Sequence, residues 1–297
     1  MKTISKILAS AALALALSAP APGIDDLLGQ SIRKFRYPSY DAQGQLKMEV
    51  AGDTAQVMPE GLIRITSLKM TFYEEGKTAM MIVTPVCFYD RMNQTASSEA
   101  PVTVTRPEIM INGTGFEWSE KSGSISIRSN TRVLLRRSGQ RSYLDSAPAT
   151  AGVARAESTT AAETNVTVIT SRSLSFNQKT MAAVFEGGAV VSDPELNISS
   201  DSLTVEFTDD KKVKQINADG NVVITRDTMR ANAKTATYAL QEGKITLWGK
   251  PTVMRQKDNL TAESIVFWRD SDRIICEPNA HLVIYSDSAN NSKISKN

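Results

Sequence analysis

Apolar and polar residues alternate along most of this chain, and the alternation changes phase at defined places. Residues 220–240 give the clearest example, in which a step of three separates two apolar sets: Met229, Ala231 and Ala233, then Ala236, Tyr238 and Leu240. Alternation with period two is typical of a β-strand, and an odd step is typical of a bulge or a sheet corner. The pattern therefore predicts a strand that bends in its middle.

The same step of three recurs in four other segments. It leads from Ile65 to Leu68, from Gly113 to Phe116, from Ser200 to Leu203 and from Ala262 to Ile265. A polar turn follows each of the five segments, at residues 74–77, 120–123, 209–212, 241–244 and 269–272. Another apolar strand begins after each turn, which is typical of a hairpin. Because the last three copies are about 30 residues apart, the pattern indicates a repeated unit, the kinked hairpin.

Residues 1–23 have the pattern of a secretory signal peptide. Lys2 and Lys6 precede an Ala/Leu-rich run over residues 7–17, and small residues with two prolines follow. The run is short for a membrane span, so we expect cleavage near Gly23, with a retained anchor as the alternative. No cysteine follows the run directly, which disfavours a lipoprotein. The chain is thus predicted to be exported.

Residues 24–36 carry the one helical pattern after the signal. The apolar residues of one helix face would be Ile24, Leu27, Leu28, Ile32 and Phe35. Acidic residues at the start and basic residues at the end suit the helix dipole, and Pro38 would end the segment. We expect a short helix packed across one end of the first sheet, or else a membrane-surface or partner helix.

The remaining sequence divides into two strand-rich regions. Strand patterns fill residues 24–137 after the helix and return over 165–286, whereas 138–164 is rich in Ala, Ser, Thr and Gly without apolar periodicity, as a linker is. Residues 287–297 form a polar tail. The expected fold is all-β, with two antiparallel domains joined by a flexible tether.

Charge and chemistry exclude several functions. The net charge of +2 is too small to indicate a nucleic-acid partner. Paired carboxylates lie only in predicted turns and at the helix start, and His281 lies in an alternating strand pattern without a nearby nucleophile or second ligand. We therefore expect no catalytic residues, no metal site and no cofactor. Cys87 and Cys276 lie in apolar strands of different halves, so two buried thiols are favoured over a disulfide.

A basic cluster ends the first region. It consists of Arg132, Arg136, Arg137 and Arg141. Guanidinium groups bind phosphates well, but a solvated cluster at the end of a strand is the simpler interpretation.

Short sequence segments in both halves resemble those of proteins from a known transport system. In the second half they are residues 175–177, 183–187, 191–194, 200–203, 218–222, Tyr238 and 248–251, which resemble the OstA-like domain of LptA, a family of periplasmic lipopolysaccharide-transport proteins. In the first half, residues 40–44, 52–55, 73–74 and 113–118 followed by 127–130 are similar to the LptC family. The chain thus resembles a fusion of two successive bridge components.

The resemblance implies a β-jellyroll in each half, with two facing sheets that leave an open apolar groove for lipopolysaccharide acyl chains. It also implies three partners: lipid A acyl chains, an inner-membrane lipopolysaccharide ABC transporter and an outer-membrane lipopolysaccharide assembly protein. From the interior phase of the strands we predict these groove residues: Ile65, Leu68, Met70, Ile111, Phe116, Ile198, Leu203, Val205, Val222, Ile224, Ala236, Tyr238, Leu247, Leu260, Ile265 and Phe267.

An open groove suits transport physically. Because each buried CH₂ contributes roughly 0.8 kcal/mol, complete enclosure of several acyl chains would hold the lipid too tightly to release it. No nucleotide-binding loop is present in the sequence, so the energy for direction must come from another protein. Two other classes fit the strand pattern less well: an enzyme on a parallel β-helix, and a structural or adhesion β-sandwich with a packed core.

Edge strands are expected to join jellyrolls end to end. Residues 126–135 would pair with residues 165–176, either within one molecule or between neighbouring copies. Residues 280–285 would contact a further jellyroll or an outer-membrane partner. Such pairing is head-to-tail, so self-association would be open-ended.

Overall fold

The computed structural model describes residues 29–58, 61–90, 92–119, 121–136, 142–146, 166–208, 213–268, 271 and 273–285. The predicted signal peptide, the polar tail and most of the predicted linker lie outside these residues. The described residues form a 19-stranded antiparallel sheet. No helix among them is long and apolar enough to cross a membrane.

The strands of the first half are long. They are β1 (Ser31–Tyr40), β2 (Leu46–Val57), β3 (Leu62–Glu74), β4 (Lys77–Asp90), β5 (Thr95–Thr105), β6 (Ile109–Ser119) and β7 (Ser124–Arg136). In the second half they are β8 (Val166–Ser171), β9 (Ser173–Asn177), β10 (Ala182–Ser192), β11 (Asn197–Phe207), β12 (Val213–Arg226), β13 (Met229–Ala239), β14 (Lys244–Trp248), β15 (Thr252–Arg255), β16 (Asp258–Thr261), β17 (Ser264–Trp268), β18 (Ile274–Glu277) and β19 (His281–Val283). Two 3₁₀ turns complete the structure, η4 (Tyr143–Ser146) and η5 (Leu240–Glu242).

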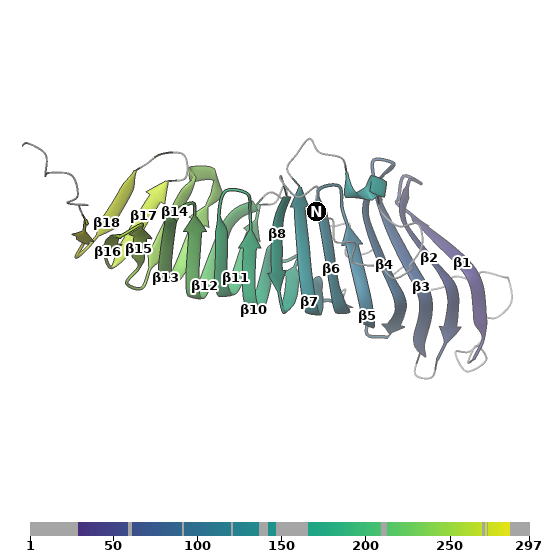
Figure 1. The fold of residues 1–297 in the computed structure, drawn as a ribbon. Coiled ribbons are helices and arrows are strands. Elements are labelled where there is room, and N and C mark those ends of the chain that lie inside the picture. Colours follow the sequence, from purple (N-terminus) through teal and green to yellow (C-terminus); the bar gives the residue numbers. More distant parts are fainter. Residues whose placement is uncertain are drawn as a thin grey trace, which may run out of the picture.

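The strands form two facing layers, because most of them bend in the middle and contribute to both (Figure 1). Layer A is the ladder that runs through β9, β14, β17 and β18, and layer B is the ladder that runs through β8, β15, β16 and β19. Strand β13 shows the exchange directly, since its first residues pair with β15 and its last residues pair with β14. The result is an open β-jellyroll whose bent strands close one side.

Register shifts mark the bends. The pairing of β11 with β12 skips from Ser199 to Ser202, and that of β5 with β6 skips from Ser98 to Pro101. Some bends need a left-handed backbone, which glycine adopts without a penalty. At Gly220 the φ angle is +76°, and an added Cβ would lie 2.2 Å from Asp201 Oδ2. Proline is found where the ladder is interrupted, as at Pro85 and Pro101, because it cannot donate a ladder hydrogen bond.

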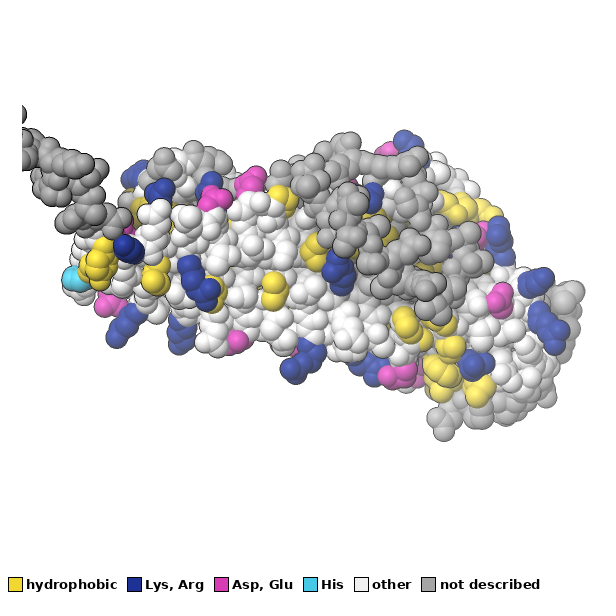
Figure 2. Space-filling model, viewed as in Figure 1, with side chains coloured by type: hydrophobic (Ala, Val, Ile, Leu, Met, Phe, Trp, Pro, Cys, Tyr) yellow, Lys and Arg dark blue, Asp and Glu magenta, His cyan; other side chains and the backbone are white. Residues whose placement is uncertain are grey.

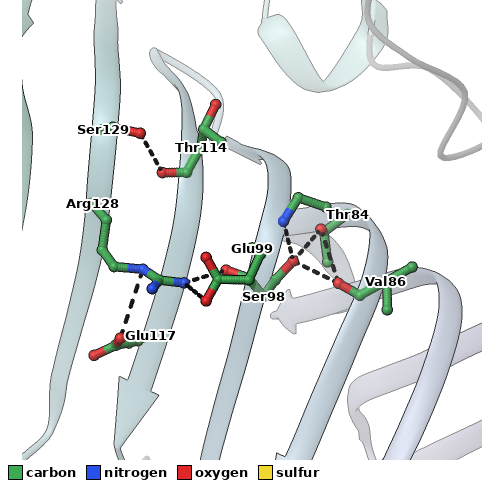
Figure 3. Close-up of polar contacts among 9 residues, drawn as sticks. Thr84, Val86, Ser98, Glu99, Thr114, Glu117, Arg128 and Ser129 are labelled. Atoms are coloured by element: carbon green, nitrogen blue, oxygen red, sulfur yellow. Dashed lines mark hydrogen bonds and ion pairs between the residues drawn. The ribbon is translucent and has the colours of Figure 1, made fainter.

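Hydroxyl groups satisfy carbonyls that the bends release from the ladder. Ser171 Oγ donates to Ser173 O at 2.8 Å, and Ser200 Oγ donates to Ser202 O at the same distance. In the first half, Ser98 Oγ donates to Val86 O at 2.6 Å (Figure 3). A buried carbonyl without a partner is costly, so these serines stabilise the corners.

The predicted kinks and hairpins are confirmed. Ser67 bends β3 with φ +53°, Gly115 bends β6 with φ +75°, and a break at 262–263 separates β16 from β17. Turns 74–77 and 241–244 connect paired strands as expected. The kinks are more numerous than the sequence indicated, since β4, β5, β7, β10 and β12 bend as well.

The prediction of a helix over residues 24–36 is wrong for the part that the structure describes. Residues 31–40 form β1, which pairs with β2 from Ser31 to Tyr40. Phe35 and Tyr37 alternate with exposed neighbours, and a Cβ on Gly52 would lie 2.8 Å from the Phe35 ring. Pairing with β2 and packing of Phe35 on bare backbone therefore outweigh the helical spacing. Pro38 is tolerated because β1 is an edge strand.

The two halves join through strand pairing within one molecule. Residues 131–136 of β7 pair with β8, and residues 124–127 pair with β9. Strands β8 and β9 pair in turn with the two arms of β10. Both layers consequently pass from one half to the other without a break (Figure 1). This is the intramolecular pairing of residues 126–135 with 165–176 that the sequence suggested.

Part of the predicted linker is anchored. The Tyr143 amide donates to Pro107 O at 3.0 Å, and the Arg136 guanidinium carbon lies 3.6 Å from the centre of the Tyr143 ring. Tyr143 is only 5% exposed. The turn η4 contacts β4, where Met81 is buried on the outer face of layer B. The linker is therefore fixed to the first half near its start.

Both cysteines are free thiols, as expected. Cys87 pairs with Ile65 in layer A, and Cys276 pairs with Ile265 in the same layer. Burial raises the pKa of the Cys87 thiol from 9.0 to about 12 and also raises that of Cys276. Each thiol therefore acts as a small apolar side chain.

Candidate functional site

Layer A carries one continuous apolar row along its inner face. Each residue of the row pairs with the next across neighbouring strands. From the first half to the second, the row is Val57, Ile63, Tyr89, Ala96, Trp118, Ile125, Phe176, Ala183, Val205, Ile216, Tyr238, Ile245, Phe267 and Ile274. At roughly 4.8 Å between strands, it extends about 60 Å.

Layer B faces it with a second row of the same kind. This row is Tyr37, Val50, Met70, Ile82, Val104, Ile111, Val133, Ile169, Val191, Ile198, Ile224, Ala231, Val253, Leu260 and Leu282. Neither row contains a charged residue. The two rows enclose an apolar interior that passes through the joint between the halves.

The interior is accessible from one side. Bent strands connect the layers along the closed side, and along the other side each hairpin turn belongs to one layer. No described strand pairs across this open side. Several apolar side chains there are only half-buried, although they pack against the core: Ile109, Trp118, Leu135, Phe176, Leu196, Phe207, Met229, Tyr238, Leu260 and Phe267. We call this open side the mouth of the groove.

All sixteen residues predicted for the groove lie in the interior. Ten of the predicted set are buried in the core: Leu68, Phe116, Ile198, Leu203, Val205, Val222, Ile224, Ala236, Leu247 and Ile265. Ile65, Met70, Ile111, Tyr238, Leu260 and Phe267 are partly buried and pack against it. The structure brings these positions together as two facing surfaces, whereas their role in lipid binding remains a prediction.

Side chains fill the interior closely. A cavity of about 10 Å³ separates the layers in the second half, and its lining is apolar: Ile198, Ile216, Ala218, Ile224, Ala236, Tyr238 and Ile245. That volume is about the size of one water molecule. An acyl chain would therefore enter between the layers only if side chains at the mouth moved aside.

Sequence reasoning missed several residues at the mouth. Trp118, Phe176 and Phe207 are half-buried and pack against the core. Trp118 and Phe207 continue the apolar phase of Phe116 and Val205 by one more step of two, so the sequence did contain the signal. These aromatic residues lie close to the polar turns, so the sequence pattern indicated the ends of strands there and not groove positions.

Charged groups lie outside this interior. Arg128 forms ion pairs with Glu99 and Glu117, and its guanidinium also donates to Ser98 O at 3.1 Å (Figure 3). Hydrogen bonding to Glu99 raises the pKa of Arg128 further. Because Arg128 already has partners, this cluster is best explained as a brace on the outside of a corner.

The predicted basic cluster is only partly described. Arg136 lies against the Tyr143 ring, and Arg132 is exposed on β7. Arg137 and Arg141 lie outside the described residues. On the face shown in Figure 2, Lys and Arg are scattered among uncharged side chains.

Polar chemistry elsewhere is sparse. The described residues contain no group of three potential metal ligands, and His281 is exposed on β19. A depression of about 260 Å³ lies where β5, β6 and β7 meet, and hydroxyl side chains and Glu117 line it together with Ala96 and Trp118. Because this lining is mixed and lies on three strands only, the continuous apolar interior remains the candidate site.

Two family models match segments of the chain. Residues 76–136 match the family described as "Lipopolysaccharide-assembly, LptC-related", and residues 168–273 match "LptA/(LptD N-terminal domain) LPS transport protein". The prediction of an LptC-like segment followed by an LptA-like segment is thus confirmed.

Among solved structures, the chain is similar to LptH from Pseudomonas aeruginosa, described as the LptA homologous periplasmic component of the conserved lipopolysaccharide transport device. The sequence identity is 16% and the TM-score 0.37, over 40% of this chain and 95% of that one. No curated protein sequence matches the chain significantly.

Proposed function

We propose that this protein is a periplasmic bridge component that binds the acyl chains of lipopolysaccharide in its groove. It receives them from an inner-membrane extractor, the lipopolysaccharide ABC transporter, and passes them toward the outer membrane. The observation that carries the proposal is the pair of apolar rows, which continue across the joint without a charged residue. The two family matches support the same role.

The physical basis is a series of similar sites. A lipid that moves along the rows exchanges one apolar surface for another of similar area, so neighbouring positions differ little in free energy. The open side leaves room for the sugar and phosphate portion of the lipid in water. The protein contributes the path, and a partner supplies the energy. In this role the chain is not an enzyme and needs no cofactor.

The two ends of the layers suggest how the bridge continues. At the C-terminal end, β18 and β19 are edge strands, and Ile274, Leu282 and Ile284 are exposed beside them. Figure 2 shows apolar side chains exposed at this end. An unpaired apolar edge can add a strand from a partner. An outer-membrane lipopolysaccharide assembly protein would bind here.

The N-terminal edge differs in chemistry. Strand β1 has Pro38 and the exposed residues Arg33, Lys34 and Arg36. Proline and charges are common devices that protect an edge strand. This end would face the inner-membrane transporter, and head-to-tail self-association through β1 is the less favoured arrangement. The proposed domains are residues 24–137 and 165–286, with 1–23 as the export signal.

Photo-crosslinking in living cells tests the proposal. A photoreactive residue is placed at Ile65 in the first half or at Tyr238 in the second, in cells that make labelled lipopolysaccharide. We expect adducts at both positions, and we expect them to disappear when cellular ATP is depleted. A photoreactive residue at Val190, which is 40% exposed outside the groove, serves as the matched control.

A structural or adhesion β-sandwich is the second candidate function. The observation that favours it is the close packing of the interior, with a cavity of only about 10 Å³. A folded, exported protein without a lipid adduct at either position would support this alternative and contradict the bridge.

A further inference from the structure

Two aromatic rings meet at the mouth of the groove, just past the joint between the halves. The ring centres of Phe176 and Phe207 are 6.1 Å apart, and the ring planes are inclined by 80°. This is an edge-to-face pair, one of the favoured arrangements of aromatic side chains. Phe176 lies on β9, the first strand of layer A in the second half, and Phe207 lies on β11.

The pair spans the strand between them. Phe176 pairs with Ala183 of β10, and Ala183 pairs with Val205 of β11. Phe207 is two residues beyond Val205, and its amide donates to Met181 O at 2.8 Å. The two rings therefore meet across β10, where the partner of Phe176 is the small residue Ala183.

The aromatic pair lies at the inner row of layer A. The inner row runs from Trp118 and Ile125 through Phe176 and Ala183 to Val205. Ala183 is buried, whereas both phenylalanine side chains are half-buried at the mouth. An acyl chain that follows the row from the first half must pass Ala183, under the two rings.

We infer that Phe176 and Phe207 form an aromatic gate that controls the passage of acyl chains from the first half of the groove to the second. This inference rests on the proposed lipid-binding function. In the closed state the rings cover Ala183, and an arriving acyl chain replaces the contact between them. An edge-to-face pair at a half-exposed site is weak enough to open and to close again. The two residues are positioning residues for an acyl chain.

The test measures how lipid is distributed between the halves. In cells with labelled lipopolysaccharide, the ratio of adducts at Tyr238 to adducts at Ile65 reports passage through the joint. Ala183→Leu fills the space under the rings permanently. We expect this variant to lower the ratio about fivefold or more, as overpacking of a tight site does, while the adduct at Ile65 is unchanged.

Removal of a ring should act in the opposite direction. We expect Phe207→Ala and Phe176→Leu each to raise the ratio severalfold, because the path over Ala183 opens. Phe176→Leu retains an apolar side chain, so it tests the gate even if Ala183→Leu does not fold. Trp248→Ala is the control, since Trp248 is 53% exposed outside the groove, and it should leave the ratio unchanged.

The outcomes separate the gate from the proposed function. If the parent protein gives no adduct at Ile65 or Tyr238, lipid binding itself fails. If the parent protein gives both adducts but Phe207→Ala and Phe176→Leu leave the ratio unchanged, the gate is overturned and the groove stands. A ratio that also rises in Trp248→Ala would likewise overturn the gate, because removal of a ring outside the groove would then have the same effect.

Discussion

The two halves share one groove but differ in the side chains that line it. Around β2, β3 and β4 the interior contains methionines and an aromatic ring: Phe72 pairs with Met48 on one side and with Met80 on the other, and Met70 lies two residues before Phe72. In the second half the corresponding positions are small, as at Ala231 in layer B and Ala218 and Ala236 in layer A. Methionine adapts its shape, whereas alanine permits close approach of two layers. A common backbone therefore supports an adaptable half and a tightly packed half.

The outer faces differ as well. In the first half, Met81 and Thr105 on layer B are buried, and the linker residue Tyr143 is buried near them. In the second half, Val190 and Arg230 on the same layer are exposed. The outer face of layer B is thus covered in the first half and exposed in the second, although strand pairing continues across the joint.

The largest effect is expected from a cavity in the tightly packed half. Leu247 is completely buried, so Leu247→Ala should lower the free energy of unfolding by about 2–5 kcal/mol. Urea denaturation followed by circular dichroism measures the change. Val190→Ala, on the exposed face, should change it by less than about 0.5 kcal/mol. Equal effects of the two substitutions would contradict the packing described for this half.

Overpacking should distinguish the halves more sharply. Ala236→Leu adds volume between layers that leave almost no free space, and it should cost about 1–3 kcal/mol of unfolding free energy. Met70→Leu conserves volume in the first half and should cost less than about 1.5 kcal/mol. The same denaturation experiment applies. If Met70→Leu proved as costly as Ala236→Leu, the first half would be as rigid as the second.

Loss of the linker anchor should expose the outer face of the first half. Tyr143→Ala removes the ring beneath Arg136, and a cation–π contact contributes roughly 0.5–2 kcal/mol. In a background without the native cysteines, a thiol introduced by Met81→Cys should then react faster with a maleimide. Tyr143→Phe retains the ring and should leave the reaction rate of the Met81→Cys thiol unchanged. When the reporter thiol is introduced by Val190→Cys instead, Tyr143→Ala should leave its reaction rate unchanged as well. An unaltered rate in Tyr143→Ala would show that the turn does not protect Met81.

The last effect concerns pH and is absent near neutral pH. The pKa of Cys87 is about 12 in the folded protein and near 9.0 when the thiol is exposed. Between these values the unfolded chain loses the thiol proton and the folded chain keeps it, so stability is complete below pH 9 and falls as the pH rises toward 12. The slope due to this thiol is at most about 1.4 kcal/mol per pH unit.

Cys87→Ala should reduce that loss in denaturation midpoints measured between pH 8 and pH 11. Cys276 is less buried, so Cys276→Ala should have a weaker effect. A pH dependence that Cys87→Ala leaves intact would assign the loss to other groups.

Much of the fold can be predicted from the sequence, because the register of each strand determines which of its residues face the interior and are therefore apolar. The steps of three at Ile65–Leu68 and Ser200–Leu203 correspond to real bends, since a corner inserts an odd number of residues between two buried faces. The sixteen groove positions follow from the same rule, because a residue on the wrong phase would face water. The pairing of β7 with β8 and β9 could also be predicted, because the last strand of the first half and the first strand of the second were both expected to be edge strands.

What the sequence did not reveal depends on contacts between distant residues. Phe35 has helical spacing to Leu28 and Ile32, yet its ring packs on Gly52 in the neighbouring strand. Tyr143 lies in a stretch without apolar periodicity, and a single ring against Arg136 and Pro107 leaves no pattern. The pair of Phe176 and Phe207 requires an alanine between them on a third strand. None of these contacts produces a periodic pattern of apolar residues in the sequence.

The unbroken cross-strand register has a consequence for how such a molecule can change in size. Each additional hairpin would lengthen the groove by roughly 10 Å, since neighbouring strands are about 4.8 Å apart. Duplication of one whole kinked hairpin, such as residues 197–226, would preserve the inward phase on both of its sides. Insertion of a single residue within a strand would reverse the phase of the residues that follow it. Whole-hairpin duplication is therefore a route by which this architecture can match compartments of different width.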